Sequence, residues 1–207
     1  FINSTVATVV SVVLNVILCY LGAYAISRFH FRFLKVTLML LSFGLLIPIN
    51  SALLPIKMTM DGLHLSNSVI GLGILYAAVQ IPMSVMILST HVSGIDKAID
   101  EAARIDGCGY VQTWMKVIFP IARPGIMTAA VLAFLNNWNE YYWASLVLIT
   151  REKLTVPALL STFTTAFNTN YNGLFSAMVI IILPPVLLYC IFSRFFIEAL
   201  SGGAVKG

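Results

Sequence analysis

The sequence is poor in charged residues. Of its 207 residues only 10% are Asp, Glu, Lys or Arg, whereas 59% are hydrophobic. Soluble domains carry about 25% charged residues, so this shortage excludes an ordinary soluble protein. The mean hydropathy of +0.95 is typical of a membrane protein. The composition therefore predicts a chain that lies mostly in a lipid bilayer.

Residues that commonly bind metals or carry out catalysis are also scarce. Cys19, Cys108 and Cys190 have no metal-type spacing and no obvious disulfide partner, and the three histidines are scattered. The sequence contains neither the phosphate-binding pattern G-x-x-x-x-G-K-[ST] nor H-E-x-x-H nor a comparable catalytic set. We therefore expect no metal site, no ATP bound by this chain and no enzymatic activity of its own.

Five windows with at most one charged residue are long enough to cross a bilayer, which takes about 20 mostly apolar residues. They cover residues 6–26, 36–54, 69–90, 125–149 and 174–192. The first is not a cleaved signal peptide, because it lacks a preceding basic region and runs into Arg28. The sequence predicts an all-α, polytopic transmembrane helical bundle forming a single domain over residues 1–207. The chain begins with Phe1 rather than methionine, so we expect a segment upstream.

Lysine and arginine are distributed unevenly between the segments that connect these windows. If the windows cross in turn, one side receives Arg28, Arg32, Lys35, Lys97, Arg104, Lys116, Arg123, Arg194 and Lys206, and the other receives Lys57, Arg151 and Lys153. Because cytoplasmic loops are enriched in both residue types, the first side and the carboxy terminus are expected to be cytoplasmic. The net charge of +4 reflects this bias, and nothing in it indicates a nucleic acid partner.

The longest polar segment, residues 91–124, has the pattern of a short amphipathic helix. Ser93 and Asp96 resemble a helix start, and Gly107 resembles a stop. The expected apolar stripe is Ile95, Ala98, Ile99, Ala102 and Ile105, and the opposite face carries Lys97, Asp100, Glu101 and Arg104, with Asp100 and Arg104 as an ion pair. A second helix is expected to follow and to end at Pro120. Periodicity alone also allows an amphipathic hairpin on the membrane surface.

Two motifs in this segment resemble a known family. "EAARIDG" at residues 101–107, followed after nine residues by "VIFP" at 117–120, resembles the EAA loop of the membrane-spanning subunits of ATP-binding cassette importers. Val117 and Phe119 replace the isoleucine and leucine of the family pattern. "AYAISRFHF" from Ala23, "WNE" from Trp138 and the terminal "GGAVKG" resemble the carbohydrate branch, the permeases of maltose and multiple-sugar type.

The resemblance implies a permease that forms half of the translocation path for a sugar or oligosaccharide in the bacterial cytoplasmic (inner) membrane. Its implied partners are two ATP-binding cassette ATPase subunits, which bind ATP and Mg²⁺, a second homologous permease and an extracytoplasmic substrate-binding protein. Such permeases typically have six spans, so we expect that the first is missing here.

The implied coupling helix docks on an ATPase, with a charged contact from Glu101, a close fit at two alanines and a sharp turn at Gly107. The residues expected in this docking segment are Glu101, Ala102, Ala103, Arg104, Asp106 and Gly107.

A polar stretch interrupts the window 125–149. Asn136, Asn139, Glu140 and Trp143 would share one face of a continuous helix. A charged residue at the bilayer centre costs roughly 2.5 to 3.5 kcal/mol on insertion scales, so this face is not expected to contact lipid. Two interpretations remain open: the face lines the sugar path, or it forms hydrogen bonds with neighbouring helices.

The segment 150–172 is expected to be external, either as the place where a binding protein delivers its sugar or as a helix on the membrane surface. Two other functions also remain open, an importer permease for a non-sugar solute and a secondary transporter driven by an ion gradient. The sequence does not decide which sugar is moved or whether the permease pair is homodimeric or heterodimeric.

Overall fold

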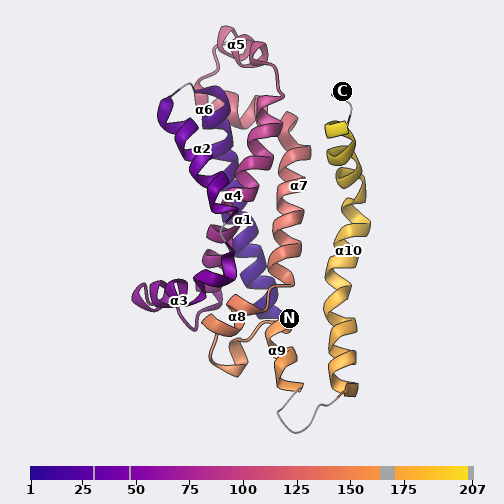
Figure 1. The fold of residues 1–207 in the computed structure, drawn as a ribbon. Helices are drawn as coiled ribbons and strands as arrows, with labels where there is room; N and C mark the ends of the chain where they lie inside the picture. Colours follow the sequence, from indigo (N-terminus) through magenta and orange to yellow (C-terminus); the bar gives the residue numbers. More distant parts are fainter. Residues whose placement is uncertain (30, 47, 164–170, 205–207) are drawn as a thin grey trace. The chain divides into compact units, whose positions relative to one another are not determined.

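The computed structural model describes residues 1–29, 31–46, 48–163 and 171–204 (Figure 1). Within these residues every regular element is a helix. In chain order they are α1 (Ile2–Arg28), α2 (Arg32–Gly44), η1 (Ile49–Ala52), α3 (Leu53–Gly62), α4 (Val69–Ser93), α5 (Lys97–Ile105), α6 (Tyr110–Gln112), the π-helical η2 (Thr113–Ile118), α7 (Phe119–Trp138), α8 (Tyr142–Val147), η3 (Arg151–Lys153), α9 (Val156–Leu159), η4 (Leu160–Phe163) and α10 (Tyr171–Ala204). Lys206, the end of the "GGAVKG" motif and residues 164–170 of the expected external segment lie outside the described residues.

Four of the described helices are long and apolar enough to cross a membrane. They are Ile2–Arg28, Val69–Ser93, Tyr110–Trp138 and Tyr171–Phe192. These helices agree with the expected all-α, polytopic architecture and contain the windows 6–26, 69–90 and 174–192.

The window 36–54 does not form one long helix. Helix α2 ends at Gly44, and the chain resumes as the short η1 and then α3, which continues to Gly62. Pro48 begins this second part in an extended conformation, with φ −63° and ψ 107°. A proline has no N–H to continue the helical hydrogen bonds, and a hydropathy window does not register that loss.

The window 125–149 differs from the observed helix at both ends. The helix runs on from α6 through η2 into α7, so Pro120 lies in the first turn of α7 and does not end a helix. In the π-helical segment the N–H of Phe119 donates to the carbonyl of Trp114, five residues earlier. Helix α7 then ends at Trp138, so the polar stretch lies at a helix end and not in mid-span.

The chain divides into two compact units. The first, unit 1, consists of Phe1–Leu14, Pro48–Val79 and Val131–Ser193. Its main core is apolar and consists of Ala7, Met60, Leu72, Leu75, Tyr76, Trp143, Ala144, Val147, Leu148 and Ala158. Helices α1 and α4 approach closely here, because a Cβ added to Gly73 would lie 2.8 Å from the backbone oxygen of Ala7.

The second, unit 2, consists of Asn15–Ile47, Gln80–Ala130 and Arg194–Gly207. Its core contains residues of α1, α4, η2 and α7, namely Cys19, Tyr20, Ala23, Tyr24, Val85, Leu88, Val92, Ile118, Ala122, Ile126 and Ala129. Tyr20 of α1 contacts the π-helical segment in two ways. Its ring stacks on the Trp114 ring with the centroids 5.3 Å apart, and its hydroxyl donates to the Trp114 carbonyl at 3.0 Å.

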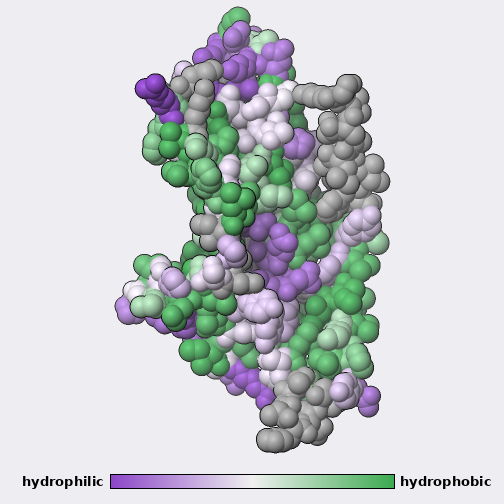
Figure 2. Space-filling model, in the orientation of Figure 1, coloured by the Kyte–Doolittle hydropathy of each residue, from purple (hydrophilic) through white to green (hydrophobic). Residues whose placement is uncertain are grey.

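Large apolar side chains are exposed on several helices. On α2 they are Phe33, Val36, Met39, Leu40 and Phe43, and on α10 they include Val179, Ile182, Leu183 and Leu187. Figure 2 shows hydrophobic residues gathered over both helices. Apolar patches of this kind mark a membrane or protein interface.

Candidate functional site

Helix α5 and its end carry the residues expected to dock on an ATPase, and Asp96 is the N-cap of this helix. The Asp96 carboxylate accepts a hydrogen bond from the N–H of Ala98 at 3.0 Å and so caps the helix. The expected start at Ser93 is wrong. Ser93 is the last residue of α4, and its hydroxyl donates to the Ser27 hydroxyl at 3.1 Å.

The end of α5 agrees with the sequence. Gly107 has φ +85°, in the left-handed region that favours glycine. The N–H of Gly107 donates to the carbonyl of Arg104 at 3.0 Å, and the N–H of Cys108 donates to the carbonyl of Ala103 at 2.9 Å. These two bonds form a Schellman motif, so the turn at Gly107 is confirmed.

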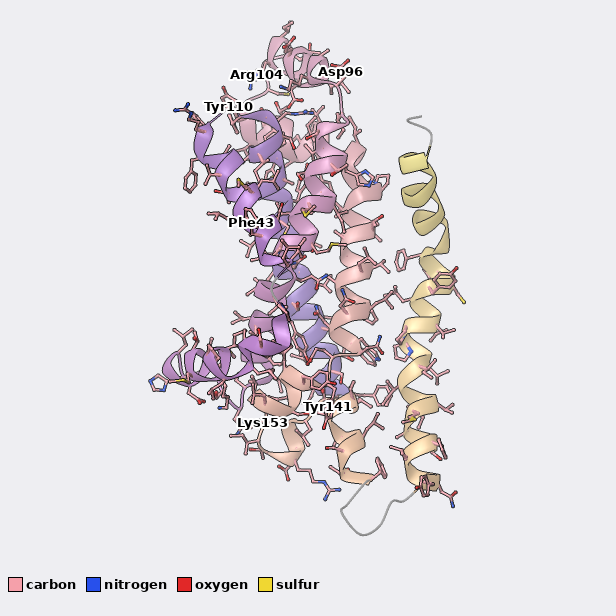
Figure 3. The ribbon with its side chains drawn as sticks, viewed as in Figure 1. Phe43, Asp96, Arg104, Tyr110, Tyr141 and Lys153 are labelled. Atoms are coloured by element: carbon pink, nitrogen blue, oxygen red, sulfur yellow. The ribbon has the colours of Figure 1, made fainter. Side chains whose placement is uncertain are left out.

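The two faces of α5 differ from the expected stripes. Asp100 is buried: its Oδ2 lies 2.9 Å from Arg28 Nε, and its Oδ1 accepts a hydrogen bond from the Tyr24 hydroxyl at 3.1 Å. Asp100 therefore pairs with two residues of α1. The expected ion pair between Asp100 and Arg104 is wrong. The Arg104 guanidinium instead lies over the ring of Tyr110, with Cζ 4.3 Å from the ring centroid (Figure 3).

One of the expected docking residues is buried, and the others are exposed. Ala103 is 6% exposed and packs inward, so it offers no close fit to a partner in this conformation. Ile105, placed in the apolar stripe, is 87% exposed. Between residues 101 and 106 the exposed side chains form the exposed α5 surface, which consists of Glu101, Ala102, Arg104, Ile105 and Asp106. Figure 2 shows hydrophilic residues gathered over α5. Sequence reasoning missed Ile105 because periodicity alone assigned it to the buried side.

Glu140 explains why α7 stops before the window does. Its Oε1 accepts a hydrogen bond from the N–H of Trp143 at 2.9 Å, and its Oε2 accepts from the N–H of Ala144 at 3.0 Å. The Tyr76 hydroxyl donates to the same Oε2 at 2.9 Å. A carboxylate is stabilised by the free N–H groups and the dipole of a helix N-terminus. Glu140, two residues before α8, therefore satisfies free N–H groups at the start of this helix instead of continuing α7.

The break separates the four residues expected to share a face. Asn136 and Asn139 are exposed, and Trp143 is 3% exposed within the core of unit 1. The Asn139 amide donates to the carbonyl of Leu135 at 2.8 Å. The single face from Asn136 to Trp143 is therefore wrong, since it required one continuous helix.

Two neighbouring side chains in this stretch form hydrogen bonds to other helices. Asn137 is buried and donates to the Ser11 hydroxyl at 2.8 Å. The Trp138 indole Nε1–H donates to the carbonyl of Ile181 in α10 at 3.0 Å. That carbonyl would accept the N–H of residue 185 in an α-helix, but residue 185 is proline. Trp138 therefore supplies the donor that Pro185 lacks.

Asn67 was not singled out by the sequence but forms many contacts in unit 1. It has φ +54°, which Asn tolerates better than most residues. Its Oδ1 accepts from the N–H groups of Ile149 and Thr150, its Nδ2 donates to the Thr150 hydroxyl, and its backbone oxygen accepts from Lys153 Nζ. Hydrogen bonds with Asn67 therefore hold the start of the expected external segment, and the short helices η3, α9 and η4 follow. Within the described residues no group of three or more His, Cys, Asp or Glu side chains could hold a metal ion.

Residues 18–202 match the family of binding-protein-dependent transport system inner membrane components. The chain belongs to this family. The resemblance drawn from "EAARIDG" is thus confirmed.

Known inner membrane components of this kind are similar to the chain over nearly its whole length. The arabinooligosaccharides transport system permease protein of Halalkalibacterium halodurans is 32% identical over 207 residues, 100% of this chain and 74% of the relative. A diacetylchitobiose uptake system permease protein of Streptomyces coelicolor is 27% identical over 205 residues, 99% of this chain and 74% of the relative. The crystal structure of a bacterial ABC transporter involved in the import of the acidic polysaccharide alginate matches with TM-score 0.82 and 25% identity, over 95% of this chain and 74% of that chain.

Membership of this family sets the general role of the chain. It is a multi-pass inner membrane permease of an ABC importer, so it is not itself the ATPase. Such systems also contain ATPase subunits, a further permease and a substrate-binding protein.

Proposed function

We propose that the chain forms one half of the path by which a sugar or oligosaccharide enters the cell. Two partner ATPase subunits bind and hydrolyse ATP with Mg²⁺, a second homologous permease completes the path, and an extracytoplasmic binding protein delivers the sugar. The observation that carries this proposal is the match, at 32% identity along the whole chain, to a permease named for arabinooligosaccharides. A second relative named for diacetylchitobiose supports the same substrate class.

Uptake by the complete transporter tests the substrate class. Proteoliposomes containing both permeases and the ATPases, with the binding protein outside, should accumulate one or more labelled oligosaccharides when ATP is inside. Uptake that persists without ATP and stops when an ionophore collapses the ion gradients would show a secondary transporter instead. ATP-driven uptake of a non-sugar solute, with no tested sugar carried, would also overturn the proposal.

We also propose that α5 lies in the cytoplasm, as the charge distribution indicates. Lys57, Arg151 and Lys153 all belong to unit 1, whereas the larger basic set belongs to unit 2. The chain then crosses the membrane between Arg32 and Lys57, so the segment broken at Pro48 serves as a fifth crossing and the carboxy terminus is cytoplasmic.

Labelling of single cysteines tests this topology. In a cysteine-free background, Arg32→Cys and Thr59→Cys introduce thiols at exposed positions on either side of Pro48. A membrane-impermeant maleimide should label Thr59→Cys in intact cells and Arg32→Cys only after lysis. Labelling of both variants from the same side would contradict the fifth crossing.

The exposed α5 surface is the proposed contact with the ATPase. Ile105 provides an apolar side chain whose full burial contributes about 1.5 to 3 kcal/mol, and Glu101 provides a charge beside it. Asp100 and Ala103 face inward and connect α5 to its own unit. A displacement of α5 by the ATPase is therefore passed to α1 through the Asp100–Arg28 ion pair.

Two substitutions and one control test this docking. Ile105→Ala and Glu101→Lys should each reduce co-purification of the ATPase while leaving membrane insertion normal. Glu152→Lys makes the same charge reversal at an exposed acid of η3, in the other unit, and should have no effect. Full ATPase association in both α5 variants would refute α5 as the coupling helix.

For the substrate path we propose that Asn136 and Asn139 contact the sugar, because both are exposed beside the break in α7. Glu140 and Trp143 position this break: one caps α8 and the other packs in the core. Asn136→Ala and Asn139→Ala should raise the KM for uptake without changing thermal stability. Unchanged uptake with a lower melting temperature would show that the asparagines are structural.

A further inference from the structure

A small charged pocket lies between the end of α1 and α5, entirely within unit 2. It has a volume of about 140 Å³ and is lined by Arg28, Lys97, Asp100, Glu101 and Arg104. The volume is enough for one small polar group. Glu101 and Arg104 also belong to the exposed α5 surface, so a partner that covers this surface covers the pocket.

The guanidinium of Arg28 is the unusual feature of this pocket. Its side chain is only 6% exposed, and Nε faces Asp100 at 2.9 Å. Nη1 and Nη2 have no hydrogen-bond partner among the described residues. Unpaired N–H groups on a buried charged side chain cost more than an ordinary unmet hydrogen bond. The N–H groups of Nη1 and Nη2 are therefore enclosed without an acceptor, and an acceptor that enters the pocket would pair with them.

The chemistry of the lining favours a carboxylate as that acceptor. The Nη1 and Nη2 groups form the planar fork that binds a carboxylate through two parallel hydrogen bonds. Three cationic and two anionic side chains line the pocket, which leaves one positive charge for a ligand to neutralise. A carboxylate carries one negative charge, whereas a phosphate group carries about −1.5 to −2 at neutral pH and would lie beside Asp100 and Glu101.

We propose that Arg28 receives an aspartate or glutamate side chain of the ATPase that docks on α5. This inference rests on the proposed function and adds a specific contact to it. Asp100 holds the guanidinium in place, and Arg104, which Tyr110 orients, lies at the same pocket. Docking then supplies the acceptor that Nη1 and Nη2 lack, so the contact forms fully only in the assembled transporter.

Zero-length cross-linking in the complete transporter identifies the acceptor. Arg28→Lys introduces a primary amine in the pocket, which a carbodiimide joins to a neighbouring carboxylate. Mass spectrometry should find a new amide bond between position 28 and an aspartate or glutamate of the ATPase. The native transporter is the control, because it has no amine at position 28 and shows the background from Lys97. Bonds only to Asp100 or Glu101 of the same chain would overturn the proposal.

A paired substitution measures the contribution of the contact. Arg28→Met combined with Asp100→Asn removes both charges, so neither is left buried alone, and the amide still accepts from the Tyr24 hydroxyl. The affinity for the ATPase should fall about 30-fold or more, as for truncated buried charge pairs at interfaces. Tyr24→Phe disturbs the same network without removing the guanidinium, and it should keep the native affinity. An equal loss in Tyr24→Phe would show a structural effect and overturn the proposal.

The remaining outcomes separate this inference from the proposed function. If Ile105→Ala weakens ATPase binding while the paired variant does not, α5 still docks but Arg28 receives no partner carboxylate. If no variant weakens binding, the docking itself is wrong. Saturable binding of inorganic phosphate to the permease pair, lost in the paired variant, would assign the pocket to a free anion. A contribution of Arg28 that appears only in vesicles with anionic lipid would assign it to a headgroup.

Discussion

The hydrogen bond between Trp138 and Ile181 predicts a specific energetic coupling with Pro185. The indole Nε1–H donates at 3.0 Å to a carbonyl that Pro185 leaves without a helical donor, and Trp138 and Ile181 are 3% and 6% exposed. Trp138→Phe therefore leaves a buried carbonyl unpaired, which costs about 1 to 3 kcal/mol. The smaller ring also loses packing, so the single substitution does not isolate the hydrogen bond.

A double-mutant cycle isolates it. Pro185→Ala restores a backbone N–H for the Ile181 carbonyl, so in this background Trp138→Phe no longer leaves the carbonyl unpaired. The packing loss is the same in both backgrounds and cancels in the difference. Hydrogen bonds between membrane helices measured in this way average about 0.6 kcal/mol and reach about 1.7. We expect a coupling of about 1 kcal/mol, because this carbonyl has no alternative helical donor.

Reversible unfolding in mixed lipid and detergent micelles measures the cycle. The matched control is Pro184→Ala, which restores a donor to the carbonyl of Ile180 and should show no coupling to Trp138→Phe. A coupling with Pro185→Ala below about 0.3 kcal/mol, the scatter of additive pairs, would refute the argument that Trp138 compensates for the proline.

Four other changes have expected outcomes. Gly107→Val forces a β-branched residue to φ +85° and should cost about 1 to 3 kcal/mol, seen as faster proteolysis after α5 and weaker ATPase association. Gly73→Leu would place a Cβ 2.8 Å from the backbone oxygen of Ala7 in α1, so the melting temperature should fall. Gly22→Leu is the control, because a Cβ there meets no atom within 4 Å, and it should leave the melting temperature unchanged. Glu140→Ala removes three hydrogen bonds to a carboxylate and should cost at least about 1.5 kcal/mol in chemical unfolding. The hydrogen bond from Lys57 lowers the pKa of Asp61. The ionised Asp61 carboxylate therefore stabilises the fold above its unfolded-state pKa, and this contribution is lost as pH falls through the folded-state pKa. The melting temperatures of wild type and Asp61→Asn should differ at neutral pH and become equal in acid.

The sequence predicted those parts of the fold that depend on composition over a long window. Three of the expected spans lie within long observed helices, because a run of apolar residues has few alternatives to a buried or lipid-facing helix. The breaks at Pro48 and after Trp138 were missed. Both are local backbone events inside apolar windows, and hydropathy does not count hydrogen-bond donors.

For the candidate site, local signals were predictable and distant partners were not. The turn at Gly107 followed from the conformational freedom of glycine, which depends on that residue alone. The burial of Asp100 depends on Tyr24 and Arg28, which lie more than seventy residues earlier. A lone arginine at the end of an apolar window is the signal that could have identified Arg28 as the partner of a buried carboxylate. In the sequence Arg28 indicated only which side of the membrane is cytoplasmic.

The two carboxylates Asp100 and Glu140 show why amphipathic patterns alone assigned polar residues incorrectly. Each was placed on a polar face, yet Asp100 is buried and Glu140 half-buried, and each pairs within its unit with a tyrosine hydroxyl and a second partner, a guanidinium for Asp100 and helix N–H groups for Glu140. A carboxylate is retained inside a protein only where such donors replace water. A polar residue in a membrane protein is therefore better assigned to a substrate path after its internal donors have been counted. By that criterion Asn136 and Asn139, which remain exposed, are stronger candidates for sugar contact than Glu140, whose carboxylate already accepts three hydrogen bonds.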